Sequence, residues 1–171
     1  TMAELGDNMQ KQMAREELGD YTEESYGTVD VAGYNYADGR YETDHEKYPN
    51  RIICGSETFV NRIGESWPLI KKLPYVIGDF TWTAWDYLGE CGIGKVDYTK
   101  NATWKYGDYP WFAAYCGDFD LIGTRRAQSY YRETVFGQAD QPYIVSQNPS
   151  HYGKKPVFTP WSFYDYVPTW N

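Results

Sequence analysis

Three short apolar runs along the chain, rich in β-branched residues, predict β-strands over residues 28–34, 51–57 and 74–82. The middle run is apolar at successive positions, Ile52, Ile53 and Cys54. Such a run is typical of a strand that is covered on both faces in a parallel sheet.

Apolar residues recur at spacings of three and four in other segments, which predicts helices over residues 2–19, 60–72 and 124–136. Gly19 is the expected end of the first helix. Thr124 is the expected N-cap of the last helix, and Gly137 its end. The polar segments between these elements predict loops over residues 20–27, 37–50 and 83–108.

Strands that alternate with helices predict the α/β fold class, with a parallel sheet and crossover helices. Three parallel strands alone would leave bare edges, so the pattern indicates part of a larger α/β fold. Residues 138–171 carry five prolines and many aromatics without a helical period. We therefore expect one domain over 1–137, followed at 138–171 by an extended linker or the start of a β-domain.

The charge balance argues against a nucleic-acid partner. The chain has 16 Lys and Arg against 24 Asp and Glu, for a net charge of −8, and no basic run is longer than two residues. No apolar stretch approaches the about 20 residues needed to cross a bilayer, so no membrane partner is expected. The sequence leaves the cellular compartment unknown.

The three cysteines, Cys54, Cys91 and Cys116, lack CxxC spacing and a nearby His cluster. We expect buried, reduced thiols and no zinc site. Neither histidine lies near a Ser or Cys nucleophile motif, and no Gly-rich phosphate loop is present, which disfavours a Ser–His–Asp hydrolase and a nucleotide-binding protein.

Candidate chemistry gathers where the predicted strands end, because active residues of parallel α/β folds lie at the carboxyl edge of the sheet. Glu57 directly follows an apolar run, where a carboxylate is costly unless it is paired or used. Its alternative role is the N-cap of the next helix. Tyr34 and Tyr36 either hydrogen-bond this carboxylate or fill the core.

The end of the third predicted strand is rich in aromatic and acidic residues. Trp82 and Trp85 suit the C–H face of a sugar, although core packing is the usual role of Trp. Asp86 adds acidity to the same edge, or is a solvated loop charge.

The runs RIICGSET at 51–58 and PYVIGDFTWTAWDYLGE at 74–90 resemble the carboxyl-terminal part of the catalytic barrel of glycoside hydrolase family 2. That family includes β-galactosidases, β-glucuronidases and β-mannosidases. Residues 30–36 resemble its sixth barrel strand, and residues 121–137 its last barrel helix. The resemblance implies about the last three β/α units of a (β/α)₈ TIM barrel.

The resemblance also implies residue roles. Glu57 matches the catalytic nucleophile, and Tyr34 matches the tyrosine that hydrogen-bonds it, with Tyr36 as a second candidate for that role. Trp82 matches the tryptophan that lines the subsite of the cleaved sugar. Tyr36, Trp85 and Asp86 are further candidates for substrate binding.

The implied activity is that of a retaining β-glycosidase, which needs a second carboxyl as acid and base. In this family that residue is a Glu after an Asn, and no Asn-Glu dipeptide occurs in this chain. We therefore expect no useful turnover from the chain alone. The acidic edge favours a neutral sugar, most simply a terminal β-galactoside.

The family often binds Mg²⁺ or Na⁺, but no ligand set for a metal is identifiable in this sequence. The expected partner is a carbohydrate substrate, and a homo-oligomer is compatible with the family. Two other classes remain open, a non-catalytic carbohydrate-binding module and a structural fragment that self-associates through exposed sheet edges.

Overall fold

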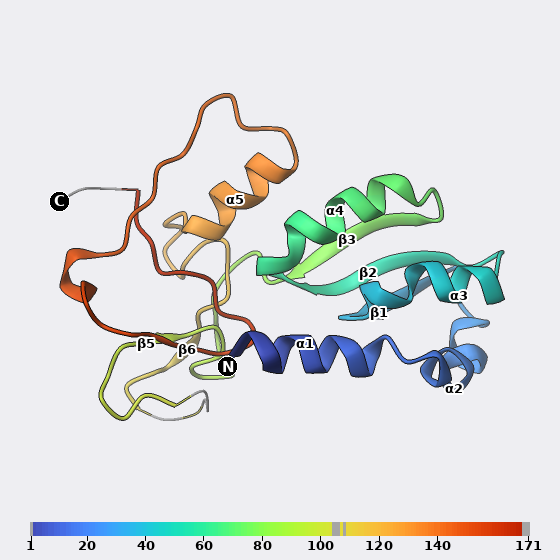
Figure 1. Ribbon diagram of the computed structural model, residues 1–171, viewed down its shortest axis with the longest axis horizontal. Helices are drawn as coiled ribbons and strands as arrows, with labels where there is room; N and C mark the ends of the chain where they lie inside the picture. Colours follow the sequence, from blue (N-terminus) through green and yellow to red (C-terminus); the bar gives the residue numbers. More distant parts are fainter. Residues whose placement is uncertain (1, 104–106, 108, 169–171) are drawn as a thin grey trace. The chain divides into compact units, whose positions relative to one another are not determined.

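The computed structural model describes residues 2–103, 107 and 109–168 (Figure 1). The chain divides into two compact units, Ala3–Thr81 and Trp82–Asn171. We describe each unit by itself.

The first unit contains a parallel three-stranded sheet in the order β1-β2-β3. Its strands are β1 (Val31–Asn35), β2 (Ile52–Phe59) and β3 (Val76–Trp82). They confirm the three predicted strands and the α/β class: β3 ends at residue 82 as predicted, and the other boundaries are shifted by one to three residues. The four helices of this unit are α1 (Met2–Met13), α2 (Glu16–Tyr26), α3 (Tyr41–Lys47) and α4 (Ile63–Lys72).

The amino-terminal helical segment differs from its prediction. The expected single helix over 2–19 is broken before Glu16, where Arg15 adopts an extended conformation, and α2 then runs through the predicted loop 20–27. Gly19 is buried inside α2 and does not end it. A Cβ at Gly19 would lie 2.9 Å from Oδ1 of Asp44, so this position needs glycine for close packing.

The predicted loop 37–50 also contains a helix, which sequence periodicity missed. A 3₁₀ turn, Asp38–Arg40, leads directly into α3. Arg40 and Asp44 form a buried ion pair of 2.6 Å, one helical turn apart. The helix is thus stabilised by buried charges and not by an apolar stripe, which is why hydrophobic spacing predicted a loop.

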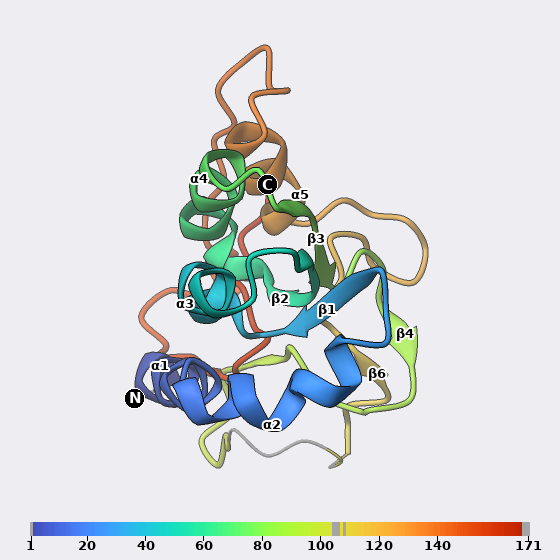
Figure 2. The same ribbon diagram turned by 90° about the vertical axis from the view of Figure 1, so that its right-hand side faces the viewer.

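One face of the sheet is packed and the other is bare. Helices α3 and α4 lie on the same side of the strands (Figure 2), and Tyr34, Ile53 and Ile70 belong to the core between these layers. Apolar side chains also occupy the opposite face, among them Val31, Ile52 and Phe80. Phe80 is 67% exposed, so this face presents apolar surface that the other elements of the first unit leave uncovered.

The second unit has little regular structure. Its short strands β4 (Tyr87–Leu88) and β6 (Ala113–Ala114) form one antiparallel pair, and β5 (Val96–Asp97) and β7 (Val157–Phe158) form another. Its core contains Ile93, Ala114 and Cys116. Gly94 has φ +74°, and a Cβ there would meet the Cys116 backbone, so two loops of this unit touch at a glycine.

The helix of this unit, α5 (Ala127–Val135), confirms the predicted helix but corrects its start. Arg126, and not Thr124, occupies the N-cap position. The Thr124 amide instead donates to Oδ1 of Asp120 at 2.7 Å, so Thr124 belongs to a turn that Asp120 closes before the helix. Gly137, with φ +71°, follows the helix end as expected.

The segment after Gly137 pairs back onto its own unit through β7. The expected domain boundary at 137 stays a prediction. The three cysteines are free, and Cys116 is fully buried while Cys54 and Cys91 are partly exposed. In the described part of the chain, no helix is long and apolar enough to span a membrane.

Replacement of Asp44 by Ala is expected to destabilise the protein by about 3–5 kcal/mol, because it leaves buried arginines without their carboxylate. Urea unfolding followed by intrinsic fluorescence measures the effect. Glu42→Ala is the matched control, since Glu42 lies on the same helix and makes only an exposed ion pair with Lys72. That control should cost less than about 1 kcal/mol. Equal losses in the two variants would contradict the importance of the buried charges.

Candidate active site

Glu57 lies near the carboxyl end of β2, the central strand of the sheet. The pairing of β1 with β2 shifts register here: Gly33 aligns with Cys54, and Asn35 aligns with Glu57. Strand β2 therefore carries one extra residue opposite β1, which is a β-bulge. Bulges redirect side chains and are common next to active sites.

Hydrogen bonds hold the backbone around Glu57 from both neighbouring strands. Ser56 Oγ donates to Oδ1 of Asn35 on β1 at 2.5 Å. Thr58 Oγ1 donates to Oδ2 of Asp79 on β3 at 2.9 Å. Glu57 thus lies between two residues whose side chains are hydrogen-bonded to the neighbouring strands, Ser56 to β1 and Thr58 to β3. These bonds fix the position of Glu57 in the sheet.

The alternative role of Glu57 as a helix N-cap is wrong. The 3₁₀ turn Val60–Arg62 is preceded by Phe59 as its N-cap, and α4 by Arg62. Glu57 is a strand residue with no capping function, so its carboxylate needs a different explanation.

Tyr34 does not occupy the position predicted for it. Its hydroxyl donates to Oδ2 of Asp44 at 2.6 Å and accepts from Nη1 of Arg51 at 3.1 Å. The ring is fully buried, and burial together with the Asp44 carboxylate raises the pKa of Tyr34. These contacts commit the hydroxyl to the packed face of the sheet, so the expected role of orienting Glu57 does not fit Tyr34.

Tyr36 follows the end of β1, and its backbone lies beside that of Glu57. Its backbone amide donates to the carbonyl oxygen of Glu57 at 2.7 Å. Its φ is +51°, which is uncommon for a residue with a bulky side chain, and its ring packs against Phe59 at 4.4 Å. Strained backbone of this kind concentrates at functional sites.

Trp82 ends β3 and, by its contacts, belongs to the second unit. Its indole Nε1 donates to the hydroxyl of Tyr87 at 3.1 Å, and the two rings meet edge to face at 5.6 Å. The Tyr87 hydroxyl in turn donates to Glu90. Burial, and then this hydrogen bond, raise the pKa of Tyr87. The chain of three side chains fixes the orientation of the indole.

Trp85 and Asp86 are neighbours in sequence with different surroundings. Trp85 is 51% exposed and stacks on Phe119 at 5.0 Å, so one face of the indole remains open to a ligand. Asp86 is buried and accepts from the Gly117 amide at 2.8 Å and from Arg126 at 2.5 Å. Burial raises the pKa of Asp86, and Arg126 opposes the shift. Both carboxylate oxygens are engaged within the fold, so Asp86 acts as a structural anchor here.

The sequence pattern did not reveal the residues that hold Glu57 in place. Ser56, Asn35 and the bulge between the strands carry no apolar signal, and their pairing becomes visible only in the sheet register. The Asp38–Arg40 turn and α3 were hidden in the same way inside a polar segment. The opposite charges of Arg40 and Asp44, four positions apart, are the sequence signal that was available for that helix.

The described residues contain no group of three or more His, Cys, Asp or Glu side chains that could hold a metal ion. A requirement for Mg²⁺ or Na⁺ stays a prediction from the family resemblance.

Two solved structures resemble this chain. One is a glycosyl hydrolase family 2 member from Bacteroides cellulosilyticus, with 33% sequence identity, a TM-score of 0.68 and coverage of 94% of this chain. The other is a glycosyl hydrolase family 2 member from Bacteroides cellulosilyticus DSM 14838, with 30% identity, a TM-score of 0.59 and the same coverage. These similarities support membership in glycosyl hydrolase family 2.

This chain spans 24% of the length of the first of those structures and 22% of the second. No protein-family model matches the sequence. No curated protein matches it either.

Tyr34→Phe tests the corrected position of Tyr34. Loss of the hydroxyl leaves the buried Asp44 carboxylate without one donor, so the free energy of unfolding should fall by about 1–3 kcal/mol. Tyr21→Phe is the control, because Tyr21 is highly exposed and should change stability by less than about 0.5 kcal/mol. Thermal and urea unfolding measure both variants. An unchanged stability of Tyr34→Phe would contradict the Asp44 contact.

Proposed function

We propose that this chain is part of a glycosyl hydrolase family 2 enzyme and that it supplies Glu57 as the nucleophile of a retaining β-glycosidase. The observation that carries the proposal is the position of Glu57. It lies in a β-bulge near the carboxyl end of the central strand of a parallel sheet. Active residues of parallel β/α folds lie at this end of their strands.

The bare face of the sheet supports the barrel that the family resemblance implies. Val31 and Ile52 are partly exposed and Phe80 is largely exposed, although all three are apolar strand residues. In a closed (β/α)₈ barrel the inner face of every strand is filled by side chains from the other strands. We propose that further strands of the same enzyme cover this face.

The proposed reaction begins when a Glu57 carboxylate oxygen forms a bond to the anomeric carbon of the sugar. The bond from that carbon to the leaving oxygen breaks, and a second carboxylic acid gives its proton to the leaving oxygen. Water then attacks the anomeric carbon, and the second carboxylate takes the proton of that water. The bond from this carbon to the Glu57 oxygen breaks, which releases the sugar and regenerates the Glu57 carboxylate. Two displacements at one carbon retain its configuration.

The chain's own residues account for only part of this reaction. Glu57 would supply the nucleophile, and Tyr36 replaces Tyr34 as the candidate for orienting it. Trp82 and Trp85 would provide aromatic surface for the sugar. The carboxyl that acts as acid and base has no counterpart in this sequence, because the family's Asn-Glu dipeptide does not occur in it.

The proposed substrate is a terminal β-galactoside or a related neutral β-glycoside. Acidic residues near the end of β3, Asp79 and Asp86 among them, disfavour approach of an anionic sugar to the reaction site. Kinetics of the complete enzyme on matched aryl galactosides and glucuronides test this choice. A strong preference for the glucuronide would overturn it.

The purified 171-residue chain is expected to show no hydrolysis of an aryl β-galactoside above background, because it lacks an assigned proton donor. Release of the aryl alcohol, followed by absorbance, provides the measurement. Hydrolysis that is well above background and is lost in Glu57→Gln would show that this chain contains a complete active site.

In a polypeptide that also carries the remainder of the barrel, Glu57→Gln should lower kcat by at least about a thousandfold, because the amide cannot form the glycosyl ester. Glu65→Gln is the matched control, since Glu65 lies on α4 and makes only an exposed contact with Arg62. A 2-deoxy-2-fluoro-galactoside should label Glu57, as read by peptide mass spectrometry. Labelling of another carboxylate would refute this assignment.

A further inference from the structure

The second unit contains a cavity that the proposed reaction does not use. Its volume is about 530 Å³, within the range of about 300–1,000 Å³ that is typical of small-molecule sites. It is formed by residues around Lys95, by the segment around Tyr115, by the start of α5 and by residues 163–168. All of these lie within the second unit.

Aromatic side chains form much of the cavity wall. Trp111 and Tyr115 meet edge to face at 5.2 Å, and Tyr130 and Tyr164 line the cavity from other segments. Aromatic walls with a few polar groups are the usual lining of ligand sites. Flat rings of this kind suit the C–H face of a pyranose.

Lys95 is the unusual polar group of this wall. Its side chain is 3% exposed, and its ammonium lies 5.4 Å from the centre of the Trp111 ring. Among the described residues its ion-pair partner is Asp97, whose Oδ2 is 3.7 Å away, which is too long for a hydrogen bond. Among the described residues the ammonium has this ion pair without a direct hydrogen bond, so an oxygen ligand in the cavity would provide a charge-assisted acceptor.

The other charges of the wall are already engaged. Arg125 pairs with Glu133, and Arg126 pairs with Asp86 at 2.5 Å. The one acidic residue named in the described lining, Asp165, accepts a hydrogen bond from Tyr98 at 2.6 Å and contacts His151 Nδ1 at 3.0 Å. Among the charged side chains of the described lining, Lys95 is therefore the one whose ion pair lacks a direct hydrogen bond and leaves the ammonium able to meet a ligand.

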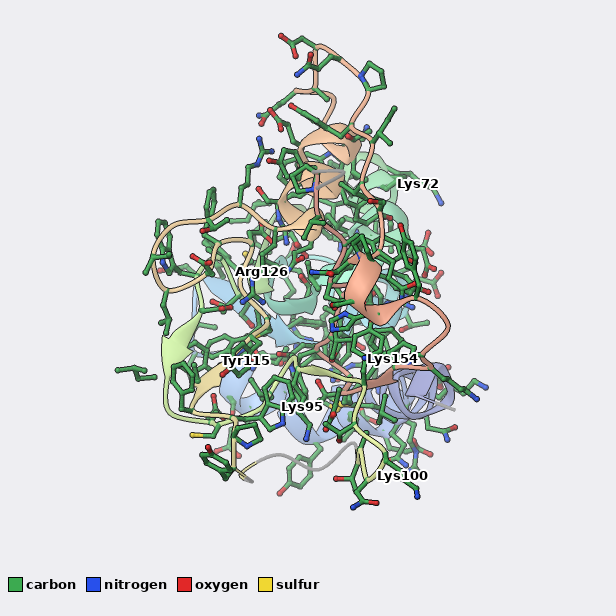
Figure 3. All side chains as sticks on the ribbon, turned by 90° about the vertical axis from the view of Figure 1, so that its left-hand side faces the viewer. Lys72, Lys95, Lys100, Tyr115, Arg126 and Lys154 are labelled. Atoms are coloured by element: carbon green, nitrogen blue, oxygen red, sulfur yellow. The ribbon has the colours of Figure 1, made fainter. Side chains whose placement is uncertain are left out.

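We propose that this cavity binds a saccharide residue carrying an anionic group, a carboxylate or a sulfate. The anionic group pairs with Lys95, and the sugar ring packs against Trp111 and its aromatic neighbours. Figure 3 shows Lys95 in the same region as Tyr115 and Arg126, with Lys100 toward the lower edge of the view. The proposal does not rest on turnover at Glu57, since it concerns equilibrium binding within the second unit.

Isothermal titration calorimetry of the 171-residue chain tests the proposal with three probes: galacturonate, galactose 6-sulfate and neutral galactose. One or both anionic sugars should bind at least about tenfold more tightly than galactose, the effect of one charge-assisted hydrogen bond. Binding of galactose with equal affinity would overturn the anionic specificity. Absence of binding by every probe would overturn the site.

Lys95→Met should weaken binding of the anionic sugar by about tenfold and leave galactose unaffected. Lys154→Met is the matched control, because Lys154 is exposed in the same unit and does not line the cavity. Tyr164→Ala removes a half-exposed ring from the wall and should weaken binding even if Lys95→Met fails to fold. Unchanged affinity in Tyr164→Ala, or in a folded Lys95→Met, would overturn the proposal. Because no turnover is measured, failure here leaves the assignment of Glu57 intact.

Discussion

Asp44 is a buried carboxylate, and an ionised carboxylate in a protein interior must be neutralised and hydrogen-bonded. Arg40 reaches it from the turn before α3, and Nη1 of Arg51 lies 3.5 Å from it at the start of β2. Tyr34 donates to it from β1, and α2 approaches it so closely that Gly19 has no room for a side chain. A single charge thus fixes two helices and two strands against one another.

This constraint also decides which side of the sheet can carry chemistry. Because the Tyr34 hydroxyl is held by Asp44, it is unavailable to Glu57. The bulge at Ser56 and Glu57 provides the necessary change of register, and Tyr36 meets the Glu57 carbonyl through its own backbone. The pairing of β1 with β2 therefore determines both which side chains lie on the packed face and where the candidate site lies.

The sheet was predictable because its strands are marked by apolar and β-branched runs, and α4 because its apolar residues repeat with helical spacing. Helix α3 was not predictable in this way, because an ion pair between Arg40 and Asp44 stabilises it. A segment with such polar residues and no apolar repeat is predicted to be a loop. Glu57 was chosen as a candidate because a carboxylate after Ile52 and Ile53 is unusual, and its catalytic role stays a prediction. Tyr34 was assigned the wrong partner, because strand position in the sequence does not reveal which side of a sheet a tyrosine faces.

The second unit depends on contacts between residues that are far apart in the sequence. Val96 pairs with Phe158, and the Tyr98 hydroxyl reaches Asp165, 67 positions away. In the first unit the paired strands β1 and β2 are only some twenty positions apart, as in Val31 with Ile52. Contacts between distant residues form only after a long loop has closed, and closing that loop lowers the entropy of the chain before the contacts add stability. During synthesis the first unit can therefore assemble early, whereas the second must wait until the residues of β7 have left the ribosome.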